Sequence, residues 1–219
     1  PIMFEFVRGD LFFFDKNIPI KRTEEGWNFF VCHIVEEFDE SLVGREVTLK
    51  VEKEFRHQLS ISHSAVHLAA LALNKVTKKY WKKEALLDTL GNPDLDKLAI
   101  QESKIGTDHS FDRYRIGKSI KKKGFNEEEF CSGLNDVQEQ INTTLEKWVA
   151  TKSQIRIISD DDTLKGNRYW VCSLPDGEVK VLCGGTHAKS LAIYKEIRVS
   201  LTRLNEEPEM IMQTTCALN

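Results

Sequence analysis

The segment from Ser60 to about Tyr80 places the strongest constraint on how this chain can fold. It is dense in alanine and leucine, which predicts a helix with Ser60 or Ser62 as its N-cap. The predicted helix is apolar almost all round, and a helix of that kind has to be buried. The rest of the chain must therefore cover this helix on most of its surface.

Segments rich in aromatic and β-branched residues lie on both sides of this helix and predict strands. Those before it are expected to form a small β-barrel or meander over residues 1–53, and in the last of them apolar and polar residues alternate. They are Met3–Val7, Asp10–Phe14, Trp27–Val35 and Val43–Val51. Those after it are Ser103–Ile116, Gln154–Ser159, the hairpin Arg168–Ser173 with Glu178–Cys183, Ile193–Leu204 and Met210–Thr215.

A second helix is predicted from Phe125 to Trp148, where apolar residues recur every three or four positions and Asn126 can cap the start. Strands, then helices, then strands indicate an α+β fold with a mainly antiparallel sheet packed against helices. We therefore expect an N-terminal β domain over residues 1–53 and a larger domain over 54–219.

Two histidines stand four residues apart in the first predicted helix. His63 and His67 would lie on one face of that helix, within reach of a single ion. The His-Glu-x-x-His pattern of metalloproteases is excluded, because Ser64 stands where the glutamate general base would be.

A second pair of metal-ligand residues occurs in Cys183-Gly-Gly-Thr-His187, where a predicted strand ends. Glycines let the backbone approach a ligand closely, and thiolate and imidazole are preferred zinc donors. Together the two half-sites predict one Zn²⁺ per chain, held by four residues that we also expect to be catalytic: His63, His67, Cys183 and His187. Other divalent metals are an alternative. Four protein ligands describe a structural zinc and three describe a catalytic one, and the spacing leaves both open.

The two half-motifs, in this order, resemble the editing domain of alanyl-tRNA synthetase and its free-standing relatives, the AlaX alanyl-tRNA editing proteins. The resemblance covers Val43–Leu73, Ser103–Trp148 and Arg168–Val199. The family usually has asparagine before the first histidine, where this chain has Ser62, and threonine where it has Val66. No Gly-Gly-Gln-type motif occurs before Gly44, so the resemblance leaves the subtype open.

The resemblance implies a trans-acting hydrolase that deacylates mischarged alanine tRNA, chiefly the seryl and also the glycyl ester. In such a site Ser64 and Thr186 would bind the serine hydroxyl, and the backbone of Gly184, Gly185 and Thr186 would receive the developing oxyanion. Two alternatives stay open. The chain could edit seryl-tRNA(Thr), or it could be a non-catalytic zinc-containing RNA-binding module.

Basic residues gather in two runs that could contact tRNA phosphates. The formal net charge is -3, so an RNA would have to be met by a local patch. Tyr80 and Trp81, within the first run, could stack a base. The predicted tRNA-binding residues are Lys78, Lys79, Lys82, Lys83, Arg113, Arg115, Lys121, Lys122 and Lys123.

The composition also indicates where in the cell the protein is expected. No apolar run approaches the roughly 18 residues that span a bilayer, so no membrane partner is expected, and neither is a dinucleotide cofactor. The five cysteines are odd in number and form no Cys-x-x-Cys pair, which favours a reducing, cytoplasmic location. The chain starts at Pro1, which leaves upstream residues, and an origin as a fragment of a synthetase, open.

Overall fold

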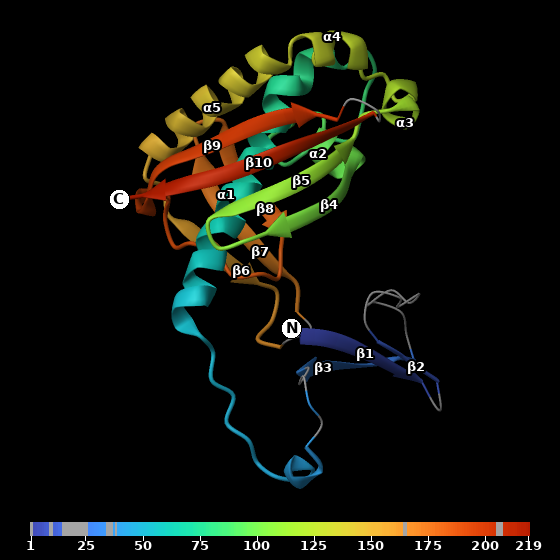
Figure 1. The fold of residues 1–219 in the computed structure, drawn as a ribbon, viewed down its shortest axis with the longest axis vertical. Helices are drawn as coiled ribbons and strands as arrows, with labels where there is room; N and C mark the ends of the chain where they lie inside the picture. Colours follow the sequence, from blue (N-terminus) through green and yellow to red (C-terminus); the bar gives the residue numbers. More distant parts are fainter. Residues whose placement is uncertain are drawn as a thin grey trace. The chain divides into compact units, whose positions relative to one another are not determined.

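The computed structural model describes residues 2–8, 11–14, 26–33, 37, 39–163, 166–204 and 208–219. The chain divides into two compact units, Pro1–Lys50 and Val51–Asn219 (Figure 1).

The first unit contains a three-stranded antiparallel sheet in the order β2-β1-β3. The strands are β1 (Ile2–Arg8), β2 (Leu11–Phe14) and β3 (Asn28–His33), followed by a short 3₁₀ turn, η2 (Glu40–Leu42). The first three predicted strands are therefore confirmed. Among the described residues the sheet is open, with β2 and β3 as its edges, so the predicted barrel is not confirmed.

The predicted strand over Val43–Val51 is wrong. Residues 43–44 form a turn and residues 45–52 belong to no strand. The apolar side chains of Val47, Leu49 and Val51 are 53%, 61% and 53% exposed. Alternation produces a strand only where a neighbouring strand supplies hydrogen-bond partners, and no described strand pairs with this segment.

The second unit is built on a four-stranded antiparallel sheet in the order β4-β5-β10-β9. Its strands are β4 (Ile100–Ile105), β5 (His109–Arg115), β9 (Tyr194–Arg203) and β10 (Glu209–Leu218). Alternate residues of β10, among them Met210, Met212 and Thr214, are buried. The predicted α+β class with an antiparallel sheet against helices is confirmed.

The central helix α1 (Lys53–Thr77) packs against β10 and against α5 (Figure 1). Leu68, Ala69, Ala72 and Leu73 are fully buried, as the apolar surface of this segment predicted. Burying one such leucine contributes about 1.5–3 kcal/mol relative to leaving it exposed. The helix begins seven residues before Ser60, so the predicted serine N-cap is wrong. The Ser60 hydroxyl instead donates to the Arg56 carbonyl, four residues back, at 2.7 Å.

The second predicted helix is divided in two. Its parts are α4 (Glu127–Ser132) and α5 (Leu134–Ala150), and Gly133 lies between them. A side chain at Gly133 would lie 3.3 Å from the Tyr80 hydroxyl, so the glycine permits this close approach. Val137, Ile141, Leu145 and Trp148 are buried, which confirms the predicted apolar face. The remaining short elements are η3 (Lys78–Tyr80), α2 (Leu95–Ala99), α3 (Lys118–Lys122) and η4 (Leu191–Ile193).

A second antiparallel sheet, in the order β6-β7-β8, contains the predicted hairpin. Its strands are β6 (Ile155–Ser159), β7 (Arg168–Leu174) and β8 (Gly177–Leu182). In the hairpin turn, Asp176 accepts a 2.7 Å hydrogen bond from Trp148 Nε1 of α5 and forms a 2.6 Å ion pair with Lys75 of α1. The hairpin is thereby fixed to both long helices.

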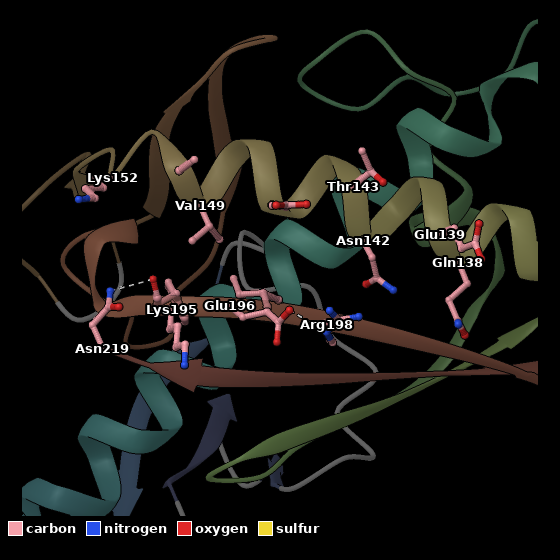
Figure 2. Close-up of a pocket in the computed structure, with 14 residues that line it drawn as sticks. Gln138, Glu139, Asn142, Thr143, Val149, Lys152, Lys195, Glu196, Arg198 and Asn219 are labelled. Carbon is pink, nitrogen blue, oxygen red and sulfur yellow. Dashed lines mark hydrogen bonds and ion pairs between the residues drawn. The ribbon is translucent and has the colours of Figure 1, made fainter.

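The outer edge of the larger sheet is covered by polar side chains of α5 (Figure 2). Asn142 bonds both the N–H and the carbonyl of Val199 in β9, and Gln138 accepts from the Leu201 N–H. These bonds satisfy edge groups that would otherwise pair with another strand. The groove of about 870 Å³ between α5 and β9 includes none of the four predicted metal ligands.

Candidate metal centre

The four predicted metal ligands converge in the structure. His63 and His67 come from α1, and Cys183 and His187 come from the loop after β8. Their donor atoms all lie within 4.8 Å of one another. The Cys183 Sγ is 3.4 Å from His63 Nε2 and 3.3 Å from His187 Nε2. Residues 120 positions apart therefore form one compact cluster of potential ligands.

The helix supplies one wall of this cluster. Because His63 and His67 are one turn apart, their rings lie side by side with centroids 4.9 Å apart. The His67 ring also stacks on the buried indole of Trp170 from β7, at 5.3 Å between centroids. The imidazole of His67 is therefore in contact with both a neighbouring histidine and an indole ring.

Hydrogen bonds to β7 and to α1 hold the opposite wall, the loop over residues 183–190. The Cys183 N–H donates to the Arg168 carbonyl at 2.8 Å, which continues the hairpin to the ligand itself. The hydroxyls of Ser60 and Thr186 hydrogen-bond at 2.8 Å, and the Ala188 N–H donates to the Ser60 carbonyl at 3.1 Å. Both ends of the Gly-Gly segment are thus fixed.

Gly185 is required by the close approach of the loop to His63. A Cβ at this position would collide with Cε1 of the His63 ring and would lie 2.6 Å from its Nδ1. Any side chain at residue 185 would therefore displace the histidine. Gly184 has open space around it and is exposed.

Electrostatics keep the three imidazoles neutral. Burial, followed by repulsion from His63, lowers the pKa of His67 to about 3. Burial and the neighbouring His63 and His67 lower the pKa of His187 to about 3 as well. Burial also lowers the pKa of His63, against a hydrogen bond with the Thr186 backbone. Neutral imidazoles keep the lone pairs that bind metals.

The pKa of the Cys183 thiol is shifted in the opposite direction. Burial raises the pKa of Cys183, and a hydrogen bond from the Gly185 backbone partly opposes that rise. A thiol ligates a metal as the thiolate, so binding would displace its proton.

One buried atom in the cluster lacks a partner. Within the described chain, His67 Nε2 is buried and makes no hydrogen bond. An unpaired buried polar group costs about 1–3 kcal/mol, and a metal ion would satisfy it. The donor types, their convergence and this unpaired nitrogen fit a metal ion.

The predicted substrate-binding residues occupy different environments. Ser64 is fully buried, and its Oγ lies 3.3 Å from His187 Nδ1 and accepts from the Ala188 N–H at 3.0 Å. Gly184 and Gly185 are exposed on the loop, and Thr186 is half-buried with its hydroxyl bonded to Ser60. The structure thus places Ser64 behind the cluster and the two glycines on its accessible side.

The structure brings the two predicted lysine runs together. Trp81 pairs with Phe125, and the Lys82 N–H donates to the Gly124 carbonyl at 2.8 Å. We call the resulting patch the basic surface. It consists of the exposed residues Lys78, Lys79, Lys82, Lys83, Lys118, Lys121, Lys122 and Lys123.

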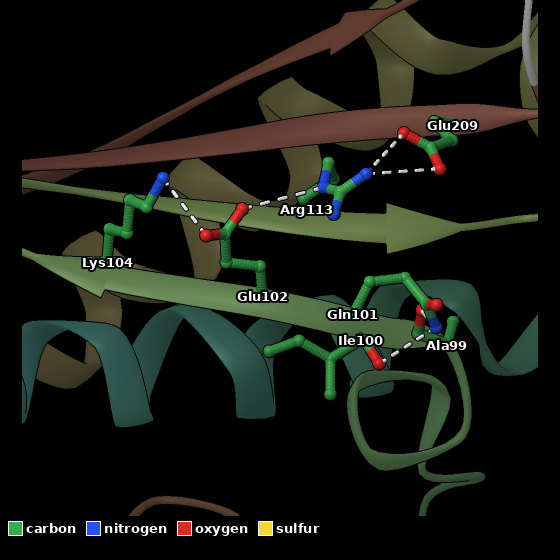
Figure 3. Close-up of polar contacts among 7 residues, drawn as sticks. All are labelled: Ala99, Ile100, Gln101, Glu102, Lys104, Arg113 and Glu209. Carbon is green, nitrogen blue, oxygen red and sulfur yellow. Dashed lines mark hydrogen bonds and ion pairs between the residues drawn. The ribbon is translucent and has the colours of Figure 1, made fainter. Parts of the chain in front are cut away.

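The two predicted arginines lie on β5 and not on the lysine-bearing elements η3 and α3. Arg113 Nη1 is 3.2 Å from Glu209 Oε2, and its Nε is 3.7 Å from Glu102 Oε2 (Figure 3). These two carboxylates balance its charge within the sheet. Arg115, two residues later, is exposed.

Sequence reasoning missed Trp170, Ser60 and Tyr194 around the metal-type cluster. Each comes from a position that only the tertiary fold brings to the site, so spacing gave no signal for them. The proposed base-stacking role of Tyr80 is wrong. Its ring is 4% exposed and packs edge-on against Phe125 and Phe130.

The structure also describes four cysteines and the lengths of the helices. Cys131, Cys172, Cys183 and Cys216 are free thiols. In the part of the chain that the structure describes, no helix combines the length and apolarity needed to cross a membrane.

Among known proteins, the chain is similar in sequence to an alanyl-tRNA editing protein, although no family model matches it. It is 28% identical over 200 residues to the alanyl-tRNA editing protein AlaX-M of Pyrococcus horikoshii, an alignment that covers 90% of this chain and 74% of that protein. This similarity extends over most of the chain and supports the predicted resemblance to the AlaX alanyl-tRNA editing proteins.

Proposed function

We propose that this chain is a trans-acting aminoacyl-tRNA deacylase that hydrolyses seryl-tRNA(Ala), and also glycyl-tRNA(Ala), at the His/Cys cluster. The observation that carries the proposal is the convergence of four ligand-type side chains beside an exposed Gly-Gly loop. The similarity to AlaX-M, a protein named for alanyl-tRNA editing, supports the choice of substrate class.

Zinc is the metal that the donor set favours. With zinc–ligand bonds of about 2.0 Å to nitrogen and 2.3 Å to sulfur, neighbouring ligands of a tetrahedral ion lie roughly 3.5 Å apart. The two Sγ–Nε2 distances of 3.4 and 3.3 Å agree with that spacing. His63, His67, Cys183 and His187 would hold the ion. When bound, it would supply positive charge that polarises the ester carbonyl.

The chain itself would orient the ester and move protons. A water attacks the carbonyl carbon of the aminoacyl ester, and the bond to the ribose oxygen of the terminal adenosine breaks. One of the three histidines, in its neutral form and not bound to the metal at this step, takes the proton from the water. That proton then passes to the departing ribose hydroxyl, so the products are a free amino acid and an uncharged tRNA.

The exposed loop is suited to the developing negative charge. The backbone N–H groups of Gly184, Gly185 and Thr186, on the loop beside the cluster, are the donors that we propose for the oxyanion. No Cβ at Gly184 obstructs this side of the cluster. An ester can therefore approach the backbone closely there.

The basic surface would bind the tRNA backbone. Eight exposed lysines on η3, α3 and their adjoining loops offer point charges to phosphates. We propose that tRNA affinity falls steeply as salt rises, because each phosphate contact releases counterions.

Release of amino acid from seryl-, glycyl- and alanyl-tRNA(Ala), with and without a chelator, tests the proposal. We expect rapid hydrolysis of the seryl ester, little of the alanyl ester, and loss of activity with the chelator. Hydrolysis of seryl-tRNA(Thr) instead would move the activity to the other tRNA. Binding of tRNA without hydrolysis of any ester would identify a non-catalytic module.

A further inference from the structure

A groove between α5 and the C-terminal end of α1, with η3, carries charge of one sign only. It has a volume of about 530 Å³, and the described side chains that line it include lysines and no carboxylate. We call it the lysine groove. Its four lysines are Lys75, Lys78, Lys79 and Lys147.

Most of this positive charge is not balanced by the protein itself. Lys75 forms a 2.6 Å ion pair with Asp176, so its charge already has a partner. Within the part of the chain that the structure describes, Lys78, Lys79 and Lys147 are exposed and form no ion pair. Like charges that share a groove repel one another, so a bound anion would stabilise their arrangement.

Helix α5 adds uncharged hydrogen-bonding groups to the lysine groove. Gln140, Thr143 and Lys147 are exposed and follow one another at spacings of three and four residues, so they share one face of the helix. Lys79 Nζ is 3.5 Å from Gln140 Oε1, which joins the two walls of the groove. Ammonium, amide and hydroxyl groups all donate hydrogen bonds to phosphate oxygens. The lining therefore fits a chain of phosphates.

The groove between α5 and β9 shows that this separation of charge is local. Thr143 lines both grooves, but the groove beside β9 contains as many acidic residues as basic ones (Figure 2). They are Glu139, Glu146 and Glu196, and Lys152, Lys195 and Arg198. Two of them, Arg198 and Glu196, form a 2.7 Å ion pair. The two grooves therefore share a helix and differ in net charge.

We propose that the lysine groove binds the phosphate backbone of tRNA and that Lys147, which belongs to neither basic run of the sequence, is one of its phosphate contacts. Lys78 and Lys79 belong both to this groove and to the basic surface, so the groove extends that surface onto α5. Lys75 follows His67 by eight residues of α1, which is about 12 Å along the helix axis, so one RNA can reach the groove and the His/Cys cluster together. The inference rests on the proposed function only for the identity of the RNA.

Binding of unacylated tRNA(Ala) to the full chain, measured over a range of salt concentrations, tests the lysine groove without any hydrolysis. Lys147→Ala should weaken binding several-fold and reduce the salt slope by about one, because one phosphate contact is lost. Lys147→Glu should weaken binding further, since a carboxylate repels phosphate. Lys147→Arg keeps the charge and should keep most of the affinity.

Lys195→Ala is the matched control for these variants. It removes the same charge from an exposed position in the groove between α5 and β9, and it should change neither the affinity nor the salt slope. Lys147 is exposed as well, so all of these variants should unfold at the same denaturant concentration as the wild type.

Wild-type affinity and salt slope in both Lys147→Ala and Lys147→Glu would overturn the inference. So would an equal loss of affinity in Lys195→Ala, which would show a general effect of net charge, or competition by polyglutamate as strong as that by tRNA. A protein whose tRNA affinity depends on Lys147 but which hydrolyses no aminoacyl ester would support the groove and refute the proposed function. Hydrolysis of seryl-tRNA(Ala) with an affinity that does not depend on Lys147 would refute the groove and support the proposed function.

Discussion

Helix α1 carries two polar clusters on one face, and they differ in whether protein groups satisfy all of their polar atoms. One is the His/Cys cluster around His67. The other surrounds Asn74, seven residues later. Asn74 donates to Asp88 at 3.2 Å and to Asp94 at 3.0 Å, and it accepts from the Asp96 N–H at 2.9 Å.

In the Asn74 cluster, groups of the protein itself supply the hydrogen-bond partners. Asp88 also accepts from the N–H groups of Leu90 and Asn92, and Asp96 accepts from the Tyr114 hydroxyl at 2.7 Å. The first cluster contains an unpaired buried nitrogen on His67 and ligand-type atoms that face one another. We infer that the Asn74 cluster holds the 88–96 loop on α1, whereas the His/Cys cluster could bind a metal ion.

The largest expected effect comes from removing a ligand. Cys183→Ala should reduce both zinc-dependent deacylation and zinc binding at least about a hundredfold, because the site loses its only thiolate. The metal-free stability should change by less than about 1 kcal/mol. Single-turnover deacylation and denaturant unfolding measure the two effects.

Cys131→Ala, at a half-buried free cysteine on α4, is the matched control and should leave deacylation unchanged. Equal rates in Cys183→Ala and the wild type would remove the thiol from the mechanism.

Asn74→Ala should produce the reverse pattern. Loss of the amide leaves the buried partners of Asn74 unsatisfied, so the free energy of unfolding should fall by about 2–4 kcal/mol. Chemical denaturation measures this, and deacylation per folded molecule should be unchanged. A variant with wild-type stability would show that the cluster does not hold the 88–96 loop.

Asp96 should make the stability of the protein depend on pH. Burial raises the pKa of Asp96 to about 6, with smaller contributions from Asp94 and Asp112 and an opposing hydrogen bond from Tyr114. The folded state therefore holds this proton more tightly than the unfolded state. The contribution of Asp96 to stability is complete below about pH 4 and falls by about 2–3 kcal/mol as pH rises to about 6.

Asp96→Asn should not lose stability as the pH rises from about 4 to 6, so the variant should be more stable than the wild type near pH 7. The lowered pKa values of His67 and His187 act in the opposite direction over this range, so the difference between the two unfolding curves is the quantity to measure. Asp108→Asn, at an exposed carboxylate, serves as the control. Parallel curves for the wild type and Asp96→Asn would contradict the assignment.

The smallest effect concerns the basic surface. Replacing Lys121, Lys122 and Lys123 with alanine should weaken tRNA binding several-fold and reduce the salt slope by about one for each phosphate that these lysines neutralise. Lys195→Ala, in the groove between α5 and β9, should alter neither quantity. Filter binding over a range of salt concentrations distinguishes the two, and equal slopes would exclude the basic surface from tRNA binding.

Local rules account for the parts that could be predicted from sequence. His63 and His67 fall one helical turn apart, so their shared face follows from helix geometry alone. The hairpin at residues 174–177 follows from turn chemistry, and the burial of α1 follows from its composition. The convergence of Cys183 and His187 on α1 was predicted from donor chemistry and family resemblance, and the structure brings all four together.

The features that could not be predicted from sequence depend on contacts between residues that are distant along the chain. The burial of Ser64 and its hydrogen bond from the Ala188 N–H involve a residue that is distant in sequence, so residue type and spacing could not predict them. Arg113 belongs to a basic run in the sequence, but β10 brings Glu209 beside it. The Val43–Val51 alternation had the pattern of a strand and, among the described residues, no strand to pair with.

A zinc titration of deacylation tests the central claim most directly. The protein is first stripped with a chelator, and serine release from seryl-tRNA(Ala) is then followed in single turnover as zinc is added back. The rate should rise in proportion to bound zinc and reach its plateau at about one ion per chain. A rate that is already maximal without zinc, or that stays at background when one ion is bound, would contradict a catalytic metal centre at His63, His67, Cys183 and His187.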